Sequence, residues 1–180
     1  LFKKTAGRSR GWIGYTYAKT MKHIQKHGWY FPLYDRTHTL NIVGDITISV
    51  KNNVHFSTAV QASSGQPFTP PIGRYDHWQA DHDPHMPAWY WDENFLVGRK
   101  NSERLPFYFR LDVGLKQKKS IFGIPYERYL QLVNVTNHVN PLTYQYRPKE
   151  NRLTGETLGL ERAAVPMFPF FFTAGYRIEL

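Results

Sequence analysis

Residues 167–180 read MFPFFFTAGYRIEL, and apolar side chains occupy every second position of this stretch. The positions between them are mostly polar or small. The apolar set comprises Phe168, Phe170, Phe172, Ala174, Tyr176, Ile178 and Leu180. This alternation has the period of a β-strand, in which successive side chains point to opposite faces. The stretch is therefore predicted to be a strand with one apolar face.

The same alternation recurs along the chain, whereas helical periodicity is nearly absent. The further strand-like stretches are 11–20, 38–50, 53–65, 105–117 and 127–137. In the stretch 127–137, the apolar residues change from the even to the odd positions between Leu132 and Val133, which predicts a β-bulge. Residues 1–4 form the stub of another strand. We therefore expect an all-β, antiparallel chain with six full strands and one stub.

The totals exclude several classes of protein. The chain has 180 residues, no cysteine, 16% aromatic residues and a net charge of +9. No apolar run approaches the ~18 residues of a membrane helix. No phosphate-binding loop, nucleophile elbow or zinc-protease motif occurs, so we expect neither an enzyme nor a cofactor. The chain starts at Leu1 rather than Met, which suggests a processed or partial amino terminus.

The positive charge lies partly in two stretches, 3–10 and 19–28. Both fall at strand ends or in loops rather than on a binding platform, which argues against a nucleic-acid partner. Plain solvation, or contact with lipopolysaccharide phosphates and other anionic lipid heads, fits this placement better.

The lengths of the connections alternate. Short connections are expected at 5–8, at Asn52-Asn53 and near 118–122, and long loops at 20–35, 66–103 and 138–166. In an antiparallel sheet this order places all short turns at one end and all long loops at the other. Transmembrane β-barrels have this arrangement, with short periplasmic turns and long extracellular loops. A soluble β-sandwich, whose strands also alternate, is the alternative.

Five segments resemble the C-terminal barrel region of TonB-dependent outer-membrane receptors. They are RGWIGYTYAKT (10–20), YDRTHTLNIVGDITIS (34–49), SSGQPFTPPIGRYD (63–76), YLQLVNVTNHVNPLTYQYR (129–147) and ERAAVPMFPFFFTAGYRIEL (161–180). Together they cover essentially the whole chain in the order found in the family. Single motifs are only moderately specific, and the ordered set is the stronger signal.

The resemblance implies a bacterial outer-membrane transporter. Such receptors form a plugged 22-stranded barrel that takes up scarce ligands such as siderophores, cobalamin or glycans, driven by the TonB system. This chain would supply about the last six to seven strands, without plug or TonB box. Its partners would be the remaining strands and the plug, in the same receptor or another chain, together with outer-membrane lipid. The alternative is a structural subunit or split-barrel piece without its own transport.

The resemblance also suggests roles for particular residues. The family signals barrel insertion through a terminal strand ending in an aromatic residue; here Phe172, Tyr176 and Ile178 fit the pattern, and Leu180 departs from it. Charged residues on the polar strand faces would face the plug, or would simply solvate the lumen wall. They are Asp45, Arg110, Lys116 and Arg177.

The loop 74–94 is rich in aromatic and metal-ligating side chains. Its large rings could stack on a ligand or pack the loop against its neighbours. These ligand-contact candidates are Tyr75, His77, Trp78, Trp89, Tyr90 and Trp91. Imidazole and carboxylate groups also suit divalent metals, although their spacing matches no recognised site and a solvated loop is the simpler interpretation. The weak metal candidates are His77, Asp81, His82 and His85.

Overall fold

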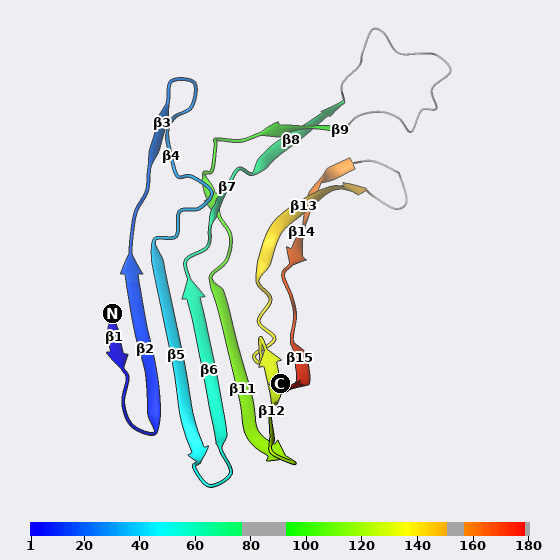
Figure 1. Cartoon of the computed structure of the whole chain (residues 1–180). Coiled ribbons are helices and arrows are strands. Elements are labelled where there is room, and N and C mark those ends of the chain that lie inside the picture. Colours follow the sequence, from blue (N-terminus) through cyan, green and yellow to red (C-terminus); the bar gives the residue numbers. More distant parts are fainter. Residues whose placement is uncertain (77–92, 151–156, 179–180) are drawn as a thin grey trace.

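The computed structural model describes residues 1–76, 93–150 and 157–178. All the regular secondary structure in these residues is β-strand. Seven strands form one antiparallel sheet in the order β1-β2-β5-β6-β11-β12-β15 (Figure 1). The predicted all-β, antiparallel class is confirmed. The strands are β1 (Phe2–Lys4), β2 (Ser9–Tyr17), β5 (His38–Ser49), β6 (Val54–Ser63), β11 (Tyr108–Ile121), β12 (Ile124–Val133) and β15 (Phe171–Ile178).

The described residues contain no helix that could cross a membrane.

The three long connections all leave the sheet at the same end, opposite the tight turns (Figure 1). They correspond to the three predicted long loops, and each contains a hairpin that was not predicted from the sequence. The hairpins are β3 (Lys22–Ile24) with β4 (Gly28–Tyr30), β8 (Pro71–Asp76) with β9 (Glu93–Val97), and β13 (Pro141–Glu150) with β14 (Thr157–Pro166). A further short pair, β7 (Pro67–Phe68) with β10 (Glu103–Arg104), lies between the sheet and the second hairpin.

The turn between β11 and β12 lies later than predicted. A short connection was predicted near 118–122, but residues 118–121 continue the ladder, and Lys118 pairs with Glu127. The turn consists of Phe122 and Gly123, whose φ angles are 52° and 82°. Positive φ at both central residues is the geometry of the two-residue turn that matches strand twist. Gly123 therefore marks the reversal.

The bulge predicted between Leu132 and Val133 is absent from the described pairing of β12. Instead β12 ends at Val133, and Asn134 takes up a left-handed conformation with φ of 52°. Asparagine tolerates this region because its short polar side chain can bond locally. Asn134 is 1% exposed, and its backbone nitrogen donates to Asp112 Oδ1 at 3.0 Å. The two consecutive apolar residues, Leu132 and Val133, are therefore the last two of the strand, and both stay in regular register with β15.

The register sorts side chains onto two chemically different faces. One row crosses the sheet as Ile46, Phe56, Leu115, Leu130 and Ala174, each directly opposite the next. The adjacent row points to the other face and contains Asp45, Ser57, Gly114, Gln131 and Thr173. Residues opposite one another in a ladder point the same way, so each row belongs to one face. The sheet thus has an apolar face and a polar face.

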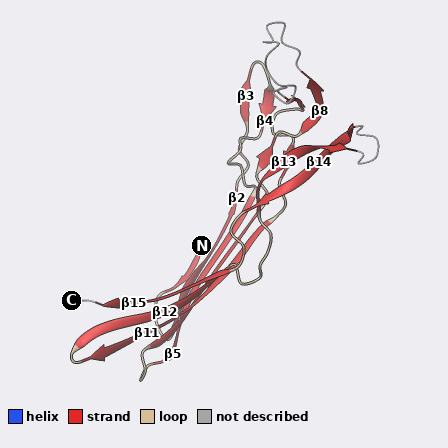
Figure 2. Ribbon diagram, turned by 90° about the vertical axis from the view of Figure 1, so that its right-hand side faces the viewer, coloured by secondary structure: helices blue, strands red, loops and turns tan. Residues whose placement is uncertain are grey.

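The described residues provide no second layer over the apolar face. Figure 2, turned by 90°, shows the long strands overlapping as one layer, with the hairpins at one end. Ile46 is 45% exposed and Phe172 is 67% exposed. The buried apolar side chains among the described residues are Ala62, Leu105 and Val133. A sheet in water normally buries such a face against another element.

Gly65 allows the two ends of the second long connection, between β6 and β11, to approach each other closely. A Cβ atom at this position would overlap the backbone carbonyl oxygen of Leu105. Gly65→Ala is therefore expected to lower the free energy of unfolding by about 1–3 kcal/mol, the usual cost of overpacking. Gly73→Ala is the matched control, because its nearest neighbour would be Leu96 Cβ at 3.7 Å, an ordinary contact. Equal losses in equilibrium unfolding of the two variants would contradict the close approach.

Candidate functional site

The polar face carries a charged cluster across three strands. Asp45 on β5 lies 3.5 Å from His55 on β6, measured between Oδ1 and Nδ1, and its Oδ2 lies 3.9 Å from Lys116 Nζ on β11. Asp45 and Lys116 were predicted independently as lumen residues, and the structure brings them together. His55 also contacts Thr47 Oγ1 at 3.3 Å and Asn53 Oδ1 at 3.0 Å. His55 was not among the predicted lumen residues, because nothing in its own strand marks it.

The other two predicted lumen residues form separate ion pairs on the same face. Arg177 Nη1 lies 4.0 Å from Glu127, which also lies 3.9 Å from Lys118 Nζ. Arg110 Nε donates to Asp112 Oδ1, two residues along its own strand, at 2.8 Å. The cations Lys118 and Arg177 are exposed, so their pairs with Glu127 stabilise the fold very little, whereas Asp112 is buried. Their consequence is a polar, hydrogen-bonding surface across the sheet.

Much of the predicted loop site lies outside the described residues. His77, Trp78, Asp81, His82, His85, Trp89, Tyr90 and Trp91 all fall there. Tyr75 lies in β8, where its backbone is paired opposite Asn94. No group of three or more His, Cys, Asp or Glu side chains suited to a metal occurs within the described residues. The metal and ligand-contact predictions for this loop stay predictions.

A buried ion pair joins the first two long connections, and sequence reasoning missed it. Asp35 is 2% exposed, and its Oδ2 accepts from Arg104 Nη2 at 2.5 Å. Its Oδ1 accepts from the backbone nitrogen of Thr20 at 2.7 Å. Arg104 also donates to the carbonyl oxygen of Gly65 at 3.0 Å. Asp35 and Arg104 are 69 residues apart, so no local pattern could have paired them.

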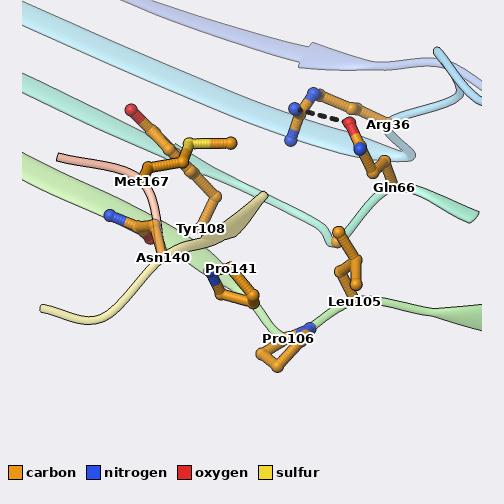
Figure 3. Close-up of a pocket in the computed structure, with 9 residues that line it drawn as sticks. Arg36, Gln66, Leu105, Pro106, Tyr108, Asn140, Pro141 and Met167 are labelled. Carbon is orange, nitrogen blue, oxygen red and sulfur yellow. Dashed lines mark hydrogen bonds between the residues drawn. The ribbon is translucent and has the colours of Figure 1, made fainter. Parts of the chain in front are cut away.

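The third long connection meets the other two at a tight junction. Figure 3 shows Arg36 and Gln66 on one side, and Tyr108, Asn140 and Met167 on the other. Arg36 Nη2 donates to Gln66 Oε1 at 3.2 Å, and Asn140 Nδ2 donates to the carbonyl oxygen of Phe109 at 2.7 Å. The enclosed space is about 10 Å³, which is no larger than a single water requires. The junction is therefore structural rather than a ligand pocket.

Aromatic rings alternate with cations beside this junction. Lys100 Nζ lies 4.5 Å from the ring centre of Tyr30, Lys22 Nζ lies 5.2 Å from that of Tyr34, and Arg104 lies 4.9 Å from that of Phe31. These distances are typical of cation–π contacts. A groove of about 250 Å³ opens here; its lining includes Met21, Trp29, Tyr30, Arg99 and Lys100. Such a surface suits an anionic or ring-shaped ligand. Lys22 falls within the basic stretch 19–28, which was expected to be solvated or to contact anionic lipid heads, and Lys100 was not singled out from the sequence.

The residues of the predicted insertion signal lie on the apolar face of β15, at one edge of the sheet. Phe172, Tyr176 and Ile178 are all exposed, and they pair opposite Leu132, Arg128 and Tyr126 of β12. Leu180 lies outside the described residues.

Comparison with known proteins identifies no relative: no protein-family model, curated protein or solved structure matches this chain.

Asp35→Asn tests the buried ion pair. Burial opposes the charged form of Asp35, but the hydrogen bonds from Arg104 and Thr20 outweigh it and lower the pKa below the ordinary 3.8. Removing the charge leaves Arg104 without its partner, and should lower the free energy of unfolding near pH 7 by about 3 kcal/mol. A carboxyl whose pKa is lower in the folded than in the unfolded protein stabilises the fold at pH values above the unfolded pKa. This stabilisation is lost as the pH falls through the folded pKa.

The difference in free energy of unfolding between the wild type and Asp35→Asn should therefore be constant from neutral pH down to about pH 4. Below pH 3.8 this difference should shrink. Chemical unfolding at several pH values measures it. In the double variant with Arg104→Gln, the two losses should not add. Full additivity, or a difference that disappears above pH 5, would contradict this account.

Proposed function

We propose that this chain forms part of the wall of a β-barrel in the bacterial outer membrane. The observation that carries the proposal is the single-layer sheet, whose exposed apolar face lies opposite a face carrying ion pairs. Lipid-facing and lumen-facing residues alternate in this way along the strands of membrane barrels. The apolar face would contact lipid, and the face bearing Asp45, Lys116 and Glu127 would line the lumen.

Strand length and connection order support the same setting. The long strands β2, β5, β6, β11 and β12 have 9 to 14 residues, and a tilted strand needs ~9–11 residues to cross a bilayer. All the tight turns lie at one end and all the hairpin-bearing connections at the other (Figure 1). With the turns in the periplasm, the three hairpins would project from the cell.

The open edges of the sheet require further strands. β15 pairs only with β12 among the described residues, and β1 pairs over just three residues with β2. In lipid every backbone group must be satisfied, so only a closed barrel is stable. The remaining strands would come from the rest of a receptor or from another chain.

The specific function that we propose is ligand uptake in a TonB-dependent receptor. The five segments that resemble this family support it, as does the aromatic and basic groove beside the first hairpin. Within such a receptor the three outer hairpins would contribute to ligand capture, and the charged face would meet the plug. The ligand would belong to the siderophore, cobalamin or glycan class.

Ile46→Arg tests the orientation of the sheet in a membrane. An arginine near the bilayer midplane should lower the free energy of unfolding in lipid vesicles by ~2–4 kcal/mol. Val43→Arg is the matched control, because Val43 is exposed on the polar face of the same strand. We expect the control to lose much less. Equal losses for the two variants would contradict a lipid-facing Ile46, and recovery of the protein without detergent would favour a soluble sandwich.

The intact mass of the polypeptide carrying this sequence, isolated from outer membranes, tests the receptor. We expect a mass several times the 21.1 kDa of this chain, with a plug domain upstream. A mass near 21.1 kDa would instead support a structural subunit that completes a barrel with a partner.

A further inference from the structure

Arg128 is a cation on the apolar face of the sheet. It lies on β12 between Leu130 and Tyr126 on the same face, and its register places it opposite Gln117 on β11 and Tyr176 on β15. Charged residues on the lipid face of a barrel strand are costly near the midplane and tolerated near the interfaces. The position of Arg128 therefore needs a chemical explanation.

The contacts of Arg128 leave much of its binding capacity unused. Its Nε and Nη2 both donate to Gln117 Oε1, the first at 2.9 Å. A guanidinium has five N–H donors, so three remain for another acceptor. Within the described part of the chain, Arg128 belongs to no ion pair, and its side chain is exposed. Lys119 lies on the same face, one row nearer the turn, opposite Tyr126.

Apolar grooves lie on both sides of Arg128 and share Arg128 and Tyr176 as a wall. One has a volume of about 430 Å³ and includes Leu115, Leu130 and Ala174 toward the middle of the sheet. The other, about 580 Å³, includes Ile121, Ile124 and Ile178 toward the turn.

Simple exposure at the turn does not account for this arginine. Arg128 lies four residues from Ile124, or about 13 Å along an extended strand. Apolar side chains, including Ile121 and Ile124, occupy this face between Arg128 and the turn. They separate the guanidinium from the turn. Two tyrosine rings flank it, Tyr126 and Tyr176, with centres 6.4 Å apart. Tyrosine is enriched where a membrane protein meets the lipid headgroups.

We propose that Arg128 and Lys119 bind the phosphate of an anionic glycerophospholipid, whose acyl chain lies along Leu115 and Leu130. This inference rests on the proposed membrane setting. The guanidinium fork matches the geometry of a phosphate, and its low hydration suits a site beside hydrocarbon. The tight turns place this end of the sheet at the periplasmic leaflet, which is built of phospholipid. The lipid is therefore a phospholipid rather than lipopolysaccharide.

The test uses the complete protein that carries this chain, extracted from membranes into detergent. Phosphatidylglycerol and phosphatidylcholine are offered in equal amounts, and native mass spectrometry counts the lipids retained. The wild type should prefer phosphatidylglycerol. Arg128→Gln should reduce that preference about fivefold, the factor equivalent to ~1 kcal/mol per cation at an anionic lipid surface. Lys119→Gln should reduce it in the same direction while leaving the Arg128–Gln117 contact in place.

Arg177→Gln is the matched control, because it removes an arginine from the opposite face of β15. It should leave the lipid preference unchanged. Equal retention of both lipids by the wild type, or an equal loss in the control, would overturn the phospholipid site. If Arg128→Gln fails to assemble, Lys119→Gln decides the question. Absence of the wild-type protein from membranes would overturn the proposed function itself, which a lack of lipid preference would not.

Discussion

The hydrogen-bonded register of the antiparallel ladder is the constraint on which the rest of the structure depends. It places Ile46 opposite Phe56 and Leu115 opposite Leu130, so that side chains of one kind share one face. Because the side-chain period of a strand is two, a slip of one residue in any pair would move a whole strand's apolar set to the charged face. The two-faced sheet therefore follows from the ladder and not from a packed core.

The end of the sheet that carries the hairpins is stabilised differently. With few buried apolar side chains among the described residues, buried polar contacts fix the connections to the sheet. Asp35 binds Arg104 and Thr20, and Asn134 binds Asp112 and the carbonyl oxygen of His138. Buried polar groups are tolerated when their partners are present and are costly when one is removed. These buried polar contacts thus hold the hairpin-bearing connections in a fixed position on the sheet without a hydrophobic core of their own.

The sequence predicts the sheet well because alternation is a local property that holds over most of each long strand. It misses the first hairpin, since the three-residue strands β3 and β4 are too short to show a period. It also places the turn after β11 too early, because residues 118–121 stay in the ladder and Gly123 supplies the positive φ that the reversal needs. The faces of Asp45 and Lys116 were predictable from alternation. Their pairing was not, because it depends on which strands become neighbours and in what register.

The distribution of charge links the two faces to the ends of the sheet. The acidic residues of the sheet strands, Asp45, Asp112 and Glu127, each lie within 4.0 Å of a basic side chain. Local pairing offsets much of the charge on the polar face, so that face is polar without a strong field of one sign. Cations such as Lys22 and Lys100 lie among aromatic rings at the hairpin end, and Arg128 and Lys119 lie on the apolar face near the turns. Attraction of anions is therefore concentrated toward the two ends of the strands, where a membrane-spanning wall would meet its surroundings.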